Sequence, residues 1–330
     1  MAEDSPQYQE PVLLIGPPKS ALTRFFPNLL TNFTFLSPFD FPPTPLPQFL
    51  LSQAQSIRVL FCISGGGSIP ITSELLSCIP NLECIVNAGV GLDHVDLSEC
   101  KRRGIRVTNA GEAFTEDVAD CAVALVIDVL RRVSAADRYV RDGSWVTKGD
   151  YPLARKVGGK RVGIIGLGSI GSEVAKRLAA FGCIIAYNSR KKKDSVSFPF
   201  YSNVTDLATN SDVLILCCAL TDKTYHIIDK TVLAALGKEG IIVNIGRGAL
   251  IDEKELVHSL VNGEIGGAGL DVFENEPNVP KELFELDNVV LSPHCAVVTP
   301  ESFSALQELC VANLEAFLSN KPLLSPVSYE

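Results

Sequence analysis

The 330-residue chain is poor in the residues that build metal centres and disulfide frameworks. It contains four histidines, no two of them at the spacing of metal ligands, so no metal is expected. Its ten cysteines include no CxxC pair, and most lie in apolar runs, where a thiol packs as a small hydrophobic side chain. These cysteines indicate free thiols in a reducing compartment.

Positive charge and long apolar segments are also scarce. The chain carries 29 basic and 38 acidic side chains, and the resulting net charge of −9 argues against nucleic acid as a partner. No apolar run approaches the length of a membrane span, and the acidic N-terminus has neither a signal-peptide core nor a transit character. The C-terminus, SPVSYE, is not a peroxisomal address. We therefore expect a cytoplasmic protein without a membrane partner.

Apolar strand-like runs alternate with helical segments along the whole chain, which predicts βαβ units and parallel sheets. The first set of expected strands covers residues 12–15, 33–36, 59–63, 83–87 and 106–108. The second set covers residues 162–165, 184–187, 213–217, 241–245, 267–270 and 289–291. The predicted fold class is α/β, with two Rossmann-like or flavodoxin-like parallel-sheet domains and a cleft between them.

Two helical segments predict how these domains are connected. Residues 117–139 read as one long helix that links the two sets of strands. Residues 300–319 form the last helical segment, which we expect to return to the first domain. The prediction is a discontinuous first domain of residues 1–111 and 296–330, around a continuous second domain of residues 112–295.

The most specific motif is GLGSIG at residues 166–171, which directly follows an apolar strand-like run and precedes a helical pattern. A dinucleotide pyrophosphate needs such a turn, because it must approach the backbone without a Cβ in the way and meet the start of a helix. A turn without a ligand is the alternative, but the strand and the helix favour a nucleotide site. The predicted cofactor contacts in this motif are Gly166, Leu167, Gly168, Ser169, Ile170 and Gly171.

The end of the next strand predicts which dinucleotide is preferred. An NAD site usually has Asp or Glu there for the ribose 2′-hydroxyl, whereas this chain has Ser189, Arg190 and Lys191. A hydroxyl and a guanidinium would hold a 2′-phosphate, which a carboxylate would repel. We therefore predict NADPH/NADP as the preferred cofactor, with NADH/NAD as the alternative. A solvated basic loop is the expected state of the lysines that follow, Lys192 and Lys193.

Three polar side chains follow strand ends of the second set: Arg247 in NIGRG, Glu276 in DVFENEP and His294 in LSPH. Ligands bind at the carboxyl ends of parallel strands, so these side chains are expected to face one site. Reduction of a 2-oxo acid needs a cation for the carboxylate, a proton donor, and a carboxylate that orients this donor. Arg247, His294 and Glu276 supply these parts. Each residue taken alone has a structural alternative: Arg247 as a cap of the helix 252–262, His294 as a structural histidine and Glu276 as a solvated loop acid.

These motifs, together with NAGVGLDHVDL at residues 87–97, give the chain a specific resemblance. From about residue 57 to residue 326 it resembles the D-isomer-specific 2-hydroxyacid dehydrogenase family, especially the plant reductases of glyoxylate, hydroxypyruvate and hydroxyphenylpyruvate. The resemblance implies that Arg247, Glu276 and His294 are the catalytic residues. It also implies further site residues: Asp271 on the nicotinamide amide, Thr115 and Ile245 along the cofactor, and the backbone N–H groups of Val90 and Gly91 on the substrate carboxylate.

The resemblance further implies a homodimer built on the cofactor domains. The helix 117–139 and the loop around Trp145 would form the contact. Trp145 lies in a polar stretch with little local apolar company, which favours an interface. Packing of this tryptophan on its own domain is the alternative.

The predicted function is NADPH-dependent reduction of small 2-oxo acids to D-2-hydroxy acids or glycolate. Hydroxypyruvate, glyoxylate and hydroxyphenylpyruvate are the candidate substrates, and Ser64, Gly65 and Gly66 after the strand 59–63 are expected to line their pocket. A plain flexible turn is the alternative for this loop. The alternative functions are a redox-sensing, corepressor-like protein that keeps the fold and cofactor, and a phosphoglycerate dehydrogenase-type enzyme. A formate dehydrogenase is a weaker alternative.

Overall fold

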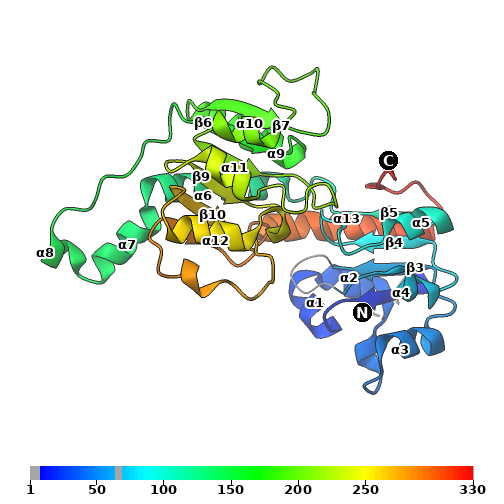
Figure 1. Ribbon diagram of the computed structural model, residues 1–330. Coiled ribbons are helices and arrows are strands. Elements are labelled where there is room, and N and C mark those ends of the chain that lie inside the picture. Colours follow the sequence, from blue (N-terminus) through cyan, green and yellow to red (C-terminus); the bar gives the residue numbers. More distant parts are fainter. Residues whose placement is uncertain (1–7, 64–68, 330) are drawn as a thin grey trace. The chain divides into compact units, whose positions relative to one another are not determined.

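The structure is a computed structural model that describes residues 8–63 and 69–329 (Figure 1). The chain divides into two compact units, one within Met1–Phe114 and Val298–Glu330, the other within Thr115–Val297. The junctions expected after residues 111 and 295 thus fall after residues 114 and 297. Among the described helices, none is both long and apolar enough to cross a membrane.

The first unit is built on a parallel sheet with the strand order β2-β1-β3-β4-β5. Its strands are β1 (Tyr8–Ile15), β2 (Phe33–Leu36), β3 (Val59–Cys62), β4 (Cys84–Asn87) and β5 (Arg106–Thr108). Its helices are α1 (Lys19–Phe25), α2 (Pro27–Asn32), α3 (Leu46–Gln53), α4 (Ser73–Ser77), α5 (Leu97–Arg103), α13 (Pro300–Leu318) and the 3-10 turn η1 (Pro38–Asp40). Every residue of β3 and β4 is buried, as expected for inner strands of a parallel sheet covered on both faces.

The second unit contains a six-stranded parallel sheet with the order β11-β10-β9-β8-β6-β7. Its strands are β6 (Arg161–Ile165), β7 (Ile184–Asn188), β8 (Val213–Leu216), β9 (Ile241–Asn244), β10 (Gly267–Leu270) and β11 (Val289–Leu291). Its helices are α6 (Thr115–Arg131), α7 (Val133–Arg141), α8 (Ser144–Lys148), α9 (Ser169–Ala180), α10 (Val204–Thr209), α11 (Lys230–Leu236), α12 (Glu253–Val261) and the 3-10 turns η2 (Gly248–Leu250) and η3 (Lys281–Leu283). The α/β fold class with two parallel-sheet domains is therefore confirmed.

The chain changes direction across this second sheet next to its first strand. From β6 it moves outward to β7, then returns to β8 on the other side and continues outward to β11. The carboxyl ends of β6 and β8 are therefore a topological switch point, where open parallel sheets bind their ligands. The motif GLGSIG directly follows β6 and lies at this point.

The single long helix expected over residues 117–139 is wrong. The helix breaks at Arg132, whose φ of 55° lies in the left-handed region, and α7 starts at the next residue. The Asp128 carboxylate accepts hydrogen bonds from the amide and the hydroxyl of Ser134, which stabilises the start of the new helix. Such a local cap is not visible in the apolar periodicity, which favours one continuous helix.

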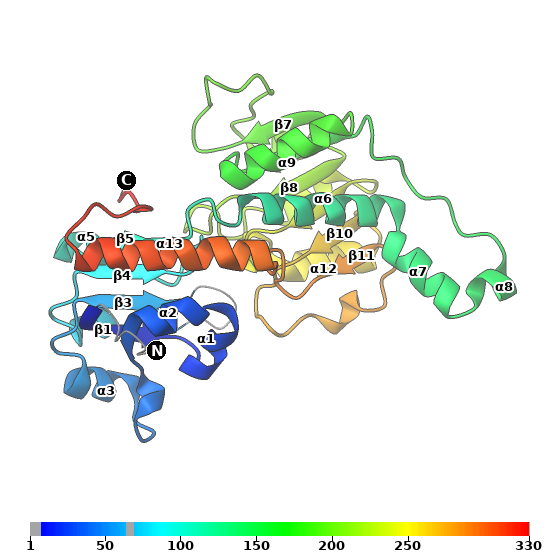
Figure 2. The ribbon, with the colours of Figure 1, turned by 180° about the vertical axis from the view of Figure 1, so that it is seen from behind.

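The apolar face of α6 belongs to the core of its own unit, where this helix packs against α9 and β10 (Figure 2). Leu125 is only 5% exposed, and its Cβ lies 3.0 Å from the position that a Cβ on Gly269 would take. The apolar face of α6 is therefore occupied within its own unit, and the predicted homodimer stays a prediction. Trp145 on α8 is 62% exposed, so it does not pack on its own domain.

Candidate active site

The turn after β6 leaves no room for side chains at two of its glycines. A Cβ at Gly166, whose φ is +94°, would lie 2.5 Å from the Cys218 amide nitrogen, and one at Gly171 would lie 2.1 Å from the Gly166 carbonyl oxygen. A Cβ at Gly168 would meet no protein atom within 4 Å, so the outer side of the turn is open. The helix α9 starts at Ser169. A bare backbone turn that runs into a helix N-terminus fits a dinucleotide pyrophosphate.

The turn after β7 presents cations rather than a carboxylate. Ser189 Oγ donates to the Lys191 carbonyl oxygen at 2.6 Å, and the Lys193 amide donates to the hydroxyl of the fully buried Tyr187 at 2.9 Å. These bonds fix the course of the turn, while the side chains of Arg190 and Lys191 are exposed. The arrangement suits a phosphate on the ribose of the bound dinucleotide.

Arg247 follows β9 and lies at the same edge of the sheet. The Asn244 side chain accepts from the Gly246 amide at 3.1 Å and donates to the Arg247 carbonyl oxygen at 2.8 Å, which shapes the turn. The helix α12 begins instead at its own cap, Asp252, whose carboxylate accepts from the Glu255 amide at 3.3 Å. The alternative interpretation of Arg247 as a helix cap is therefore wrong, and its guanidinium remains a candidate for binding an anion.

His294 and Glu276 form a direct pair, with His294 Nδ1 at 2.8 Å from Glu276 Oε2. The other oxygen, Oε1, accepts from the Phe273 amide at 3.0 Å, and the Glu276 side chain is only 15% exposed, so it is not a solvated loop acid. With Nδ1 directed at a carboxylate, Nε2 is the ring nitrogen left for proton transfer.

The electrostatic surroundings of Glu276 keep it ionised. Burial alone would raise the pKa of its carboxyl group. The hydrogen bonds from His294 and the Phe273 amide outweigh burial, helped by the charge of Arg247, so the pKa lies below the usual carboxylate value. Glu276 therefore places a negative charge beside Nδ1 of His294.

The loop that carries His294 is held by the buried carboxylate of Asp271. His294 has a φ of 52°, a left-handed conformation that non-glycine residues rarely adopt. Asp271 accepts from Ser292 Oγ at 2.6 Å, from the Cys295 amide at 2.9 Å and from the Ala296 amide at 3.1 Å. The Asp271 carbonyl oxygen also accepts from the His294 amide at 2.8 Å. These bonds span more than twenty residues, so the sequence pattern does not reveal them.

Val90 and Gly91 lie in the first unit, in the loop after β4. The Asn87 amide group donates to the carbonyl oxygens of Gly89 at 2.9 Å and Gly91 at 3.2 Å, and the Asn109 amide group donates to the Val90 carbonyl oxygen at 3.0 Å. Among residues 8–63 and 69–329 no acceptor is found for the amides of Val90 and Gly91. The loop thus has its carbonyl groups bound and two N–H groups available for an anion.

The remaining predicted site residues have different surroundings. Ile245 is buried directly after β9, and Thr115 is the first residue of α6. Ser64, Gly65 and Gly66 lie outside the described residues. In the part of the chain that the structure describes, no group of three or more His, Cys, Asp and Glu side chains could hold a metal ion.

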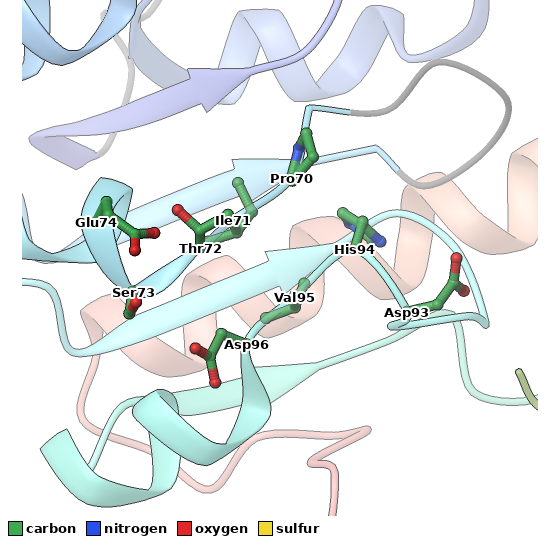
Figure 3. A pocket seen from close by; sticks show the side chains of 9 residues that line it. All are labelled: Pro70, Ile71, Thr72, Ser73, Glu74, Asp93, His94, Val95 and Asp96. Atoms are coloured by element: carbon green, nitrogen blue, oxygen red, sulfur yellow. The ribbon is translucent and has the colours of Figure 1, made fainter. Parts of the chain in front are cut away.

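A cavity of about 610 Å³ lies in the first unit, but none of the predicted site residues line it (Figure 3). It is lined by Pro70, Ile71, Thr72, Ser73, Glu74, Asp93, His94, Val95 and Asp96. Three carboxylates and one histidine do not suit an anionic 2-oxo acid, because like charges repel in a partly enclosed space. We therefore place the candidate active site at the strand ends of the second unit.

The chain is similar to several known proteins. Residues 123–296 match the model of the D-isomer specific 2-hydroxyacid dehydrogenase, NAD binding domain. A glyoxylate/hydroxypyruvate reductase of Arabidopsis thaliana is 56% identical over 100% of both chains, and a hydroxyphenylpyruvate reductase of Plectranthus scutellarioides is 51% identical over 84% of this chain and 88% of that one. An NADPH-dependent glyoxylate/hydroxypyruvate reductase of Sinorhizobium meliloti, solved with NADP and malonate, has a TM-score of 0.87 at 35% identity and covers 97% of both chains.

Proposed function

This chain belongs to the D-isomer-specific 2-hydroxyacid dehydrogenase family of oxidoreductases, and we propose that it reduces small 2-oxo acids with NADPH. The observation that carries the proposal is the 2.8 Å contact between His294 and Glu276 at the sheet edge that also presents Arg247. The proposed substrates are hydroxypyruvate, glyoxylate and hydroxyphenylpyruvate, reduced to D-2-hydroxy acids or to glycolate. The reductase activities of the two plant relatives support this substrate class.

In the proposed reaction each member of the trio has one task. Arg247 binds the substrate carboxylate as a charged fork. His294 donates the proton on Nε2 to the carbonyl oxygen as the carbon is reduced, and becomes neutral. Glu276 keeps His294 oriented and stabilises the imidazolium before transfer. The nicotinamide supplies the hydride when the cofactor is bound.

We propose that the cofactor is held by the two turns at the switch point of the second sheet. The pyrophosphate would bind the backbone of residues 166–171, and the 2′-phosphate would bind Ser189, Arg190 and Lys191. Thr115, Ile245 and Asp271 are proposed along the nicotinamide half. NADH is expected to bind more weakly, because it lacks the phosphate that these side chains would contact.

A panel of 2-oxo acids assayed with NADPH and with NADH tests the proposed function. We expect the highest kcat/KM for hydroxypyruvate with NADPH, lower values for glyoxylate, and some turnover of hydroxyphenylpyruvate. A protein that binds NADPH but reduces none of them would instead be a redox-sensing, corepressor-like protein. Faster oxidation of phosphoglycerate than reduction of any of these acids would favour the phosphoglycerate dehydrogenase type.

Arg190→Asp should shift cofactor choice. The lost charge-assisted contact to the 2′-phosphate is expected to cost about 2–3 kcal/mol, roughly 30–150-fold in kcat/KM with NADPH, and much less with NADH. Steady-state kinetics with both cofactors measure this. Lys192→Asp is the matched control, because it makes the same charge change on the neighbouring exposed side chain that we expect to be solvated. Equal losses with both cofactors in Arg190→Asp would make this arginine structural.

Glu276→Gln should move the pH profile of reduction. The reductive step uses protonated His294, so the rate falls as the pH rises and the imidazolium is lost. A glutamine keeps a hydrogen-bond partner but removes the negative charge that favours the imidazolium. The fall in kcat/KM should therefore shift to lower pH. A pH profile identical to that of the wild type would remove Glu276 from this role.

We propose a homodimer that uses the segment of α7 and α8. Trp145 is 62% and Val146 is 92% exposed on α8, and both views show α7 and α8 extending away from the sheet of their unit (Figures 1 and 2). Sedimentation should give a mass near twice 35.5 kDa. Trp145→Glu should yield folded monomer, whereas Leu125→Glu should unfold the protein, because Leu125 is a core residue. A wild-type monomer at micromolar concentration contradicts this proposal.

A further inference from the structure

A second histidine, His226, joins the loops that follow β8, β9 and β10 at the active-site edge of the second sheet. Its amide donates to the Ala249 carbonyl oxygen at 2.9 Å, in the 3-10 turn directly after Arg247. Two residues on, the Ile228 amide donates to the Leu250 carbonyl oxygen at 3.0 Å. The loop after β8 therefore runs along the segment that carries Arg247, bound to it through the backbone.

The His226 side chain reaches the loop after β10. Nε2 lies 3.0 Å from Glu274 Oε1, and Nδ1 lies 3.8 Å from Asp252 Oδ2. The ring stacks on Tyr225, with centroids 3.9 Å apart and an interplanar angle of 17°, and the Tyr225 hydroxyl donates to the same Glu274 oxygen at 3.5 Å. His226 has a φ of 49°, so its backbone is held in the left-handed region by these contacts and the loop pairing.

Glu274 stands two residues before Glu276. Its side chain contacts His226, and its backbone is held as well. Its amide donates to Glu253 Oε2 at 3.1 Å. Close packing adds to this, since a Cβ at Gly248 would lie 1.9 Å from the Phe273 carbonyl carbon. The Phe273 amide is the donor that orients Glu276, at 3.0 Å. His226 and Glu253 thus hold the segment that positions Glu276, the hydrogen-bond partner of His294.

Several carboxyl groups surround this segment. Asp252, Glu253, Glu274 and Glu276 all lie on the loops that His226 connects. Burial raises the pKa of Glu253, the Glu274 amide lowers it, and the negative charge of the Glu274 side chain raises it again. The imidazole of His226 contacts two of these carboxyl groups, Asp252 at 3.8 Å and Glu274 at 3.0 Å.

We propose that His226 is a positioning residue for the Glu276–His294 pair, acting through Glu274. It holds the loop that presents Glu276 to His294. This inference rests on the proposed function, because it gives His226 a task in proton donation. A purely structural histidine would affect only the stability of the unit.

The four histidines of the chain allow a direct test by NMR titration of the full-length protein, with His226→Asn as the main variant. Asparagine tolerates a left-handed backbone, but it is too short to reach Glu274. The titration midpoint of His294 should fall by about 0.3–1 pH unit, because a displaced Glu276 stabilises the imidazolium less. The kcat for hydroxypyruvate should fall about 3–10-fold with an unchanged KM for NADPH, as expected for a misplaced catalytic group.

His258→Asn is the matched control. His258 lies on the last turn of α12 with Nε2 at 3.9 Å from Glu264, so the substitution removes a similar histidine–carboxylate contact elsewhere in the unit. This variant should leave the His294 midpoint and kcat unchanged. His226→Gln, which keeps a donor for Glu274, should recover part of the loss.

Glu274→Gln gives an independent route if His226→Asn folds poorly. It should also lower the titration midpoint of His294. The double variant should show no larger decrease than the more affected single variant, because both substitutions remove the same contact between His226 and Glu274. A lowered unfolding temperature with an unchanged His294 midpoint in both single variants would overturn the inference. If the wild type reduces none of the 2-oxo acids, the proposed function fails. The His294 titration in the variants still tests whether His226 positions Glu276.

Discussion

His294→Gln should lower kcat for hydroxypyruvate reduction by roughly 10²–10⁴-fold, the usual contribution of a positioned general acid. Glutamine keeps a polar side chain beside Glu276, so the loop can stay in place. It cannot release a proton near neutral pH, so the developing alkoxide has no donor at the position of Nε2. Binding of NADPH should be nearly unchanged, because the proposed phosphate contacts lie at residues 166–171 and 189–191.

Two measurements separate this result from a general loss of structure. Steady-state kinetics give kcat, and quenching of the single tryptophan on NADPH addition gives the dissociation constant. His258→Gln is the control, since it makes the same substitution at a histidine on α12 that lies 3.9 Å from Glu264. His294→Gln should also lose the decrease in rate at high pH that we attribute to loss of the His294 imidazolium. A decrease in kcat of less than about fivefold would assign proton donation to another group.

The positions of Arg247, Glu276 and His294 could be predicted from the sequence, because they depend on local patterns. Each of the three follows a short apolar run that predicts a strand: Arg247 and Glu276 follow the inner strands β9 and β10, and His294 follows the edge strand β11. Parallel strands bring their carboxyl ends to one edge of the sheet. The tight turn at the glycines of GLGSIG could be predicted for the same reason. Their neighbours along the chain determine the turn, and the structure shows the close approaches that exclude a Cβ at Gly166 and Gly171.

The features that sequence patterns did not reveal depend on contacts between distant or non-apolar residues. The break at Arg132 comes from a carboxylate cap, which leaves the apolar period of α6 and α7 undisturbed. The apolar pattern around Leu125 does not show which neighbour covers it, and the structure places it beside Gly269 in the core of its unit. His226 sits in a polar loop, and its partner Glu274 is 48 residues away.

Asp271→Asn should impair both stability and turnover. The Asp271 carboxylate accepts three hydrogen bonds from the loop 292–296. The side-chain amide of asparagine can accept only on its oxygen, so its NH₂ group would face an N–H donor. Hydrogen bonds to charged groups contribute about 1.5–3 kcal/mol each, so we expect a loss of roughly 2–4 kcal/mol in the free energy of unfolding. Urea unfolding measures this, and Ser292→Ala, which removes one of the three donors, should show a smaller loss.

Turnover distinguishes this holding role from the nicotinamide contact that the resemblance implies for Asp271. His294 keeps its left-handed backbone only while the loop on both sides is fixed, so the asparagine variant should lower kcat by about 10²-fold through misplacement of the proton donor. If Asp271 served the nicotinamide alone, the KM for NADPH would rise, while the unfolding free energy and the pH profile of reduction stayed as in the wild type. Because the carboxylate is 1% exposed and already engaged by three donors, we expect kcat, stability and pH profile to change together.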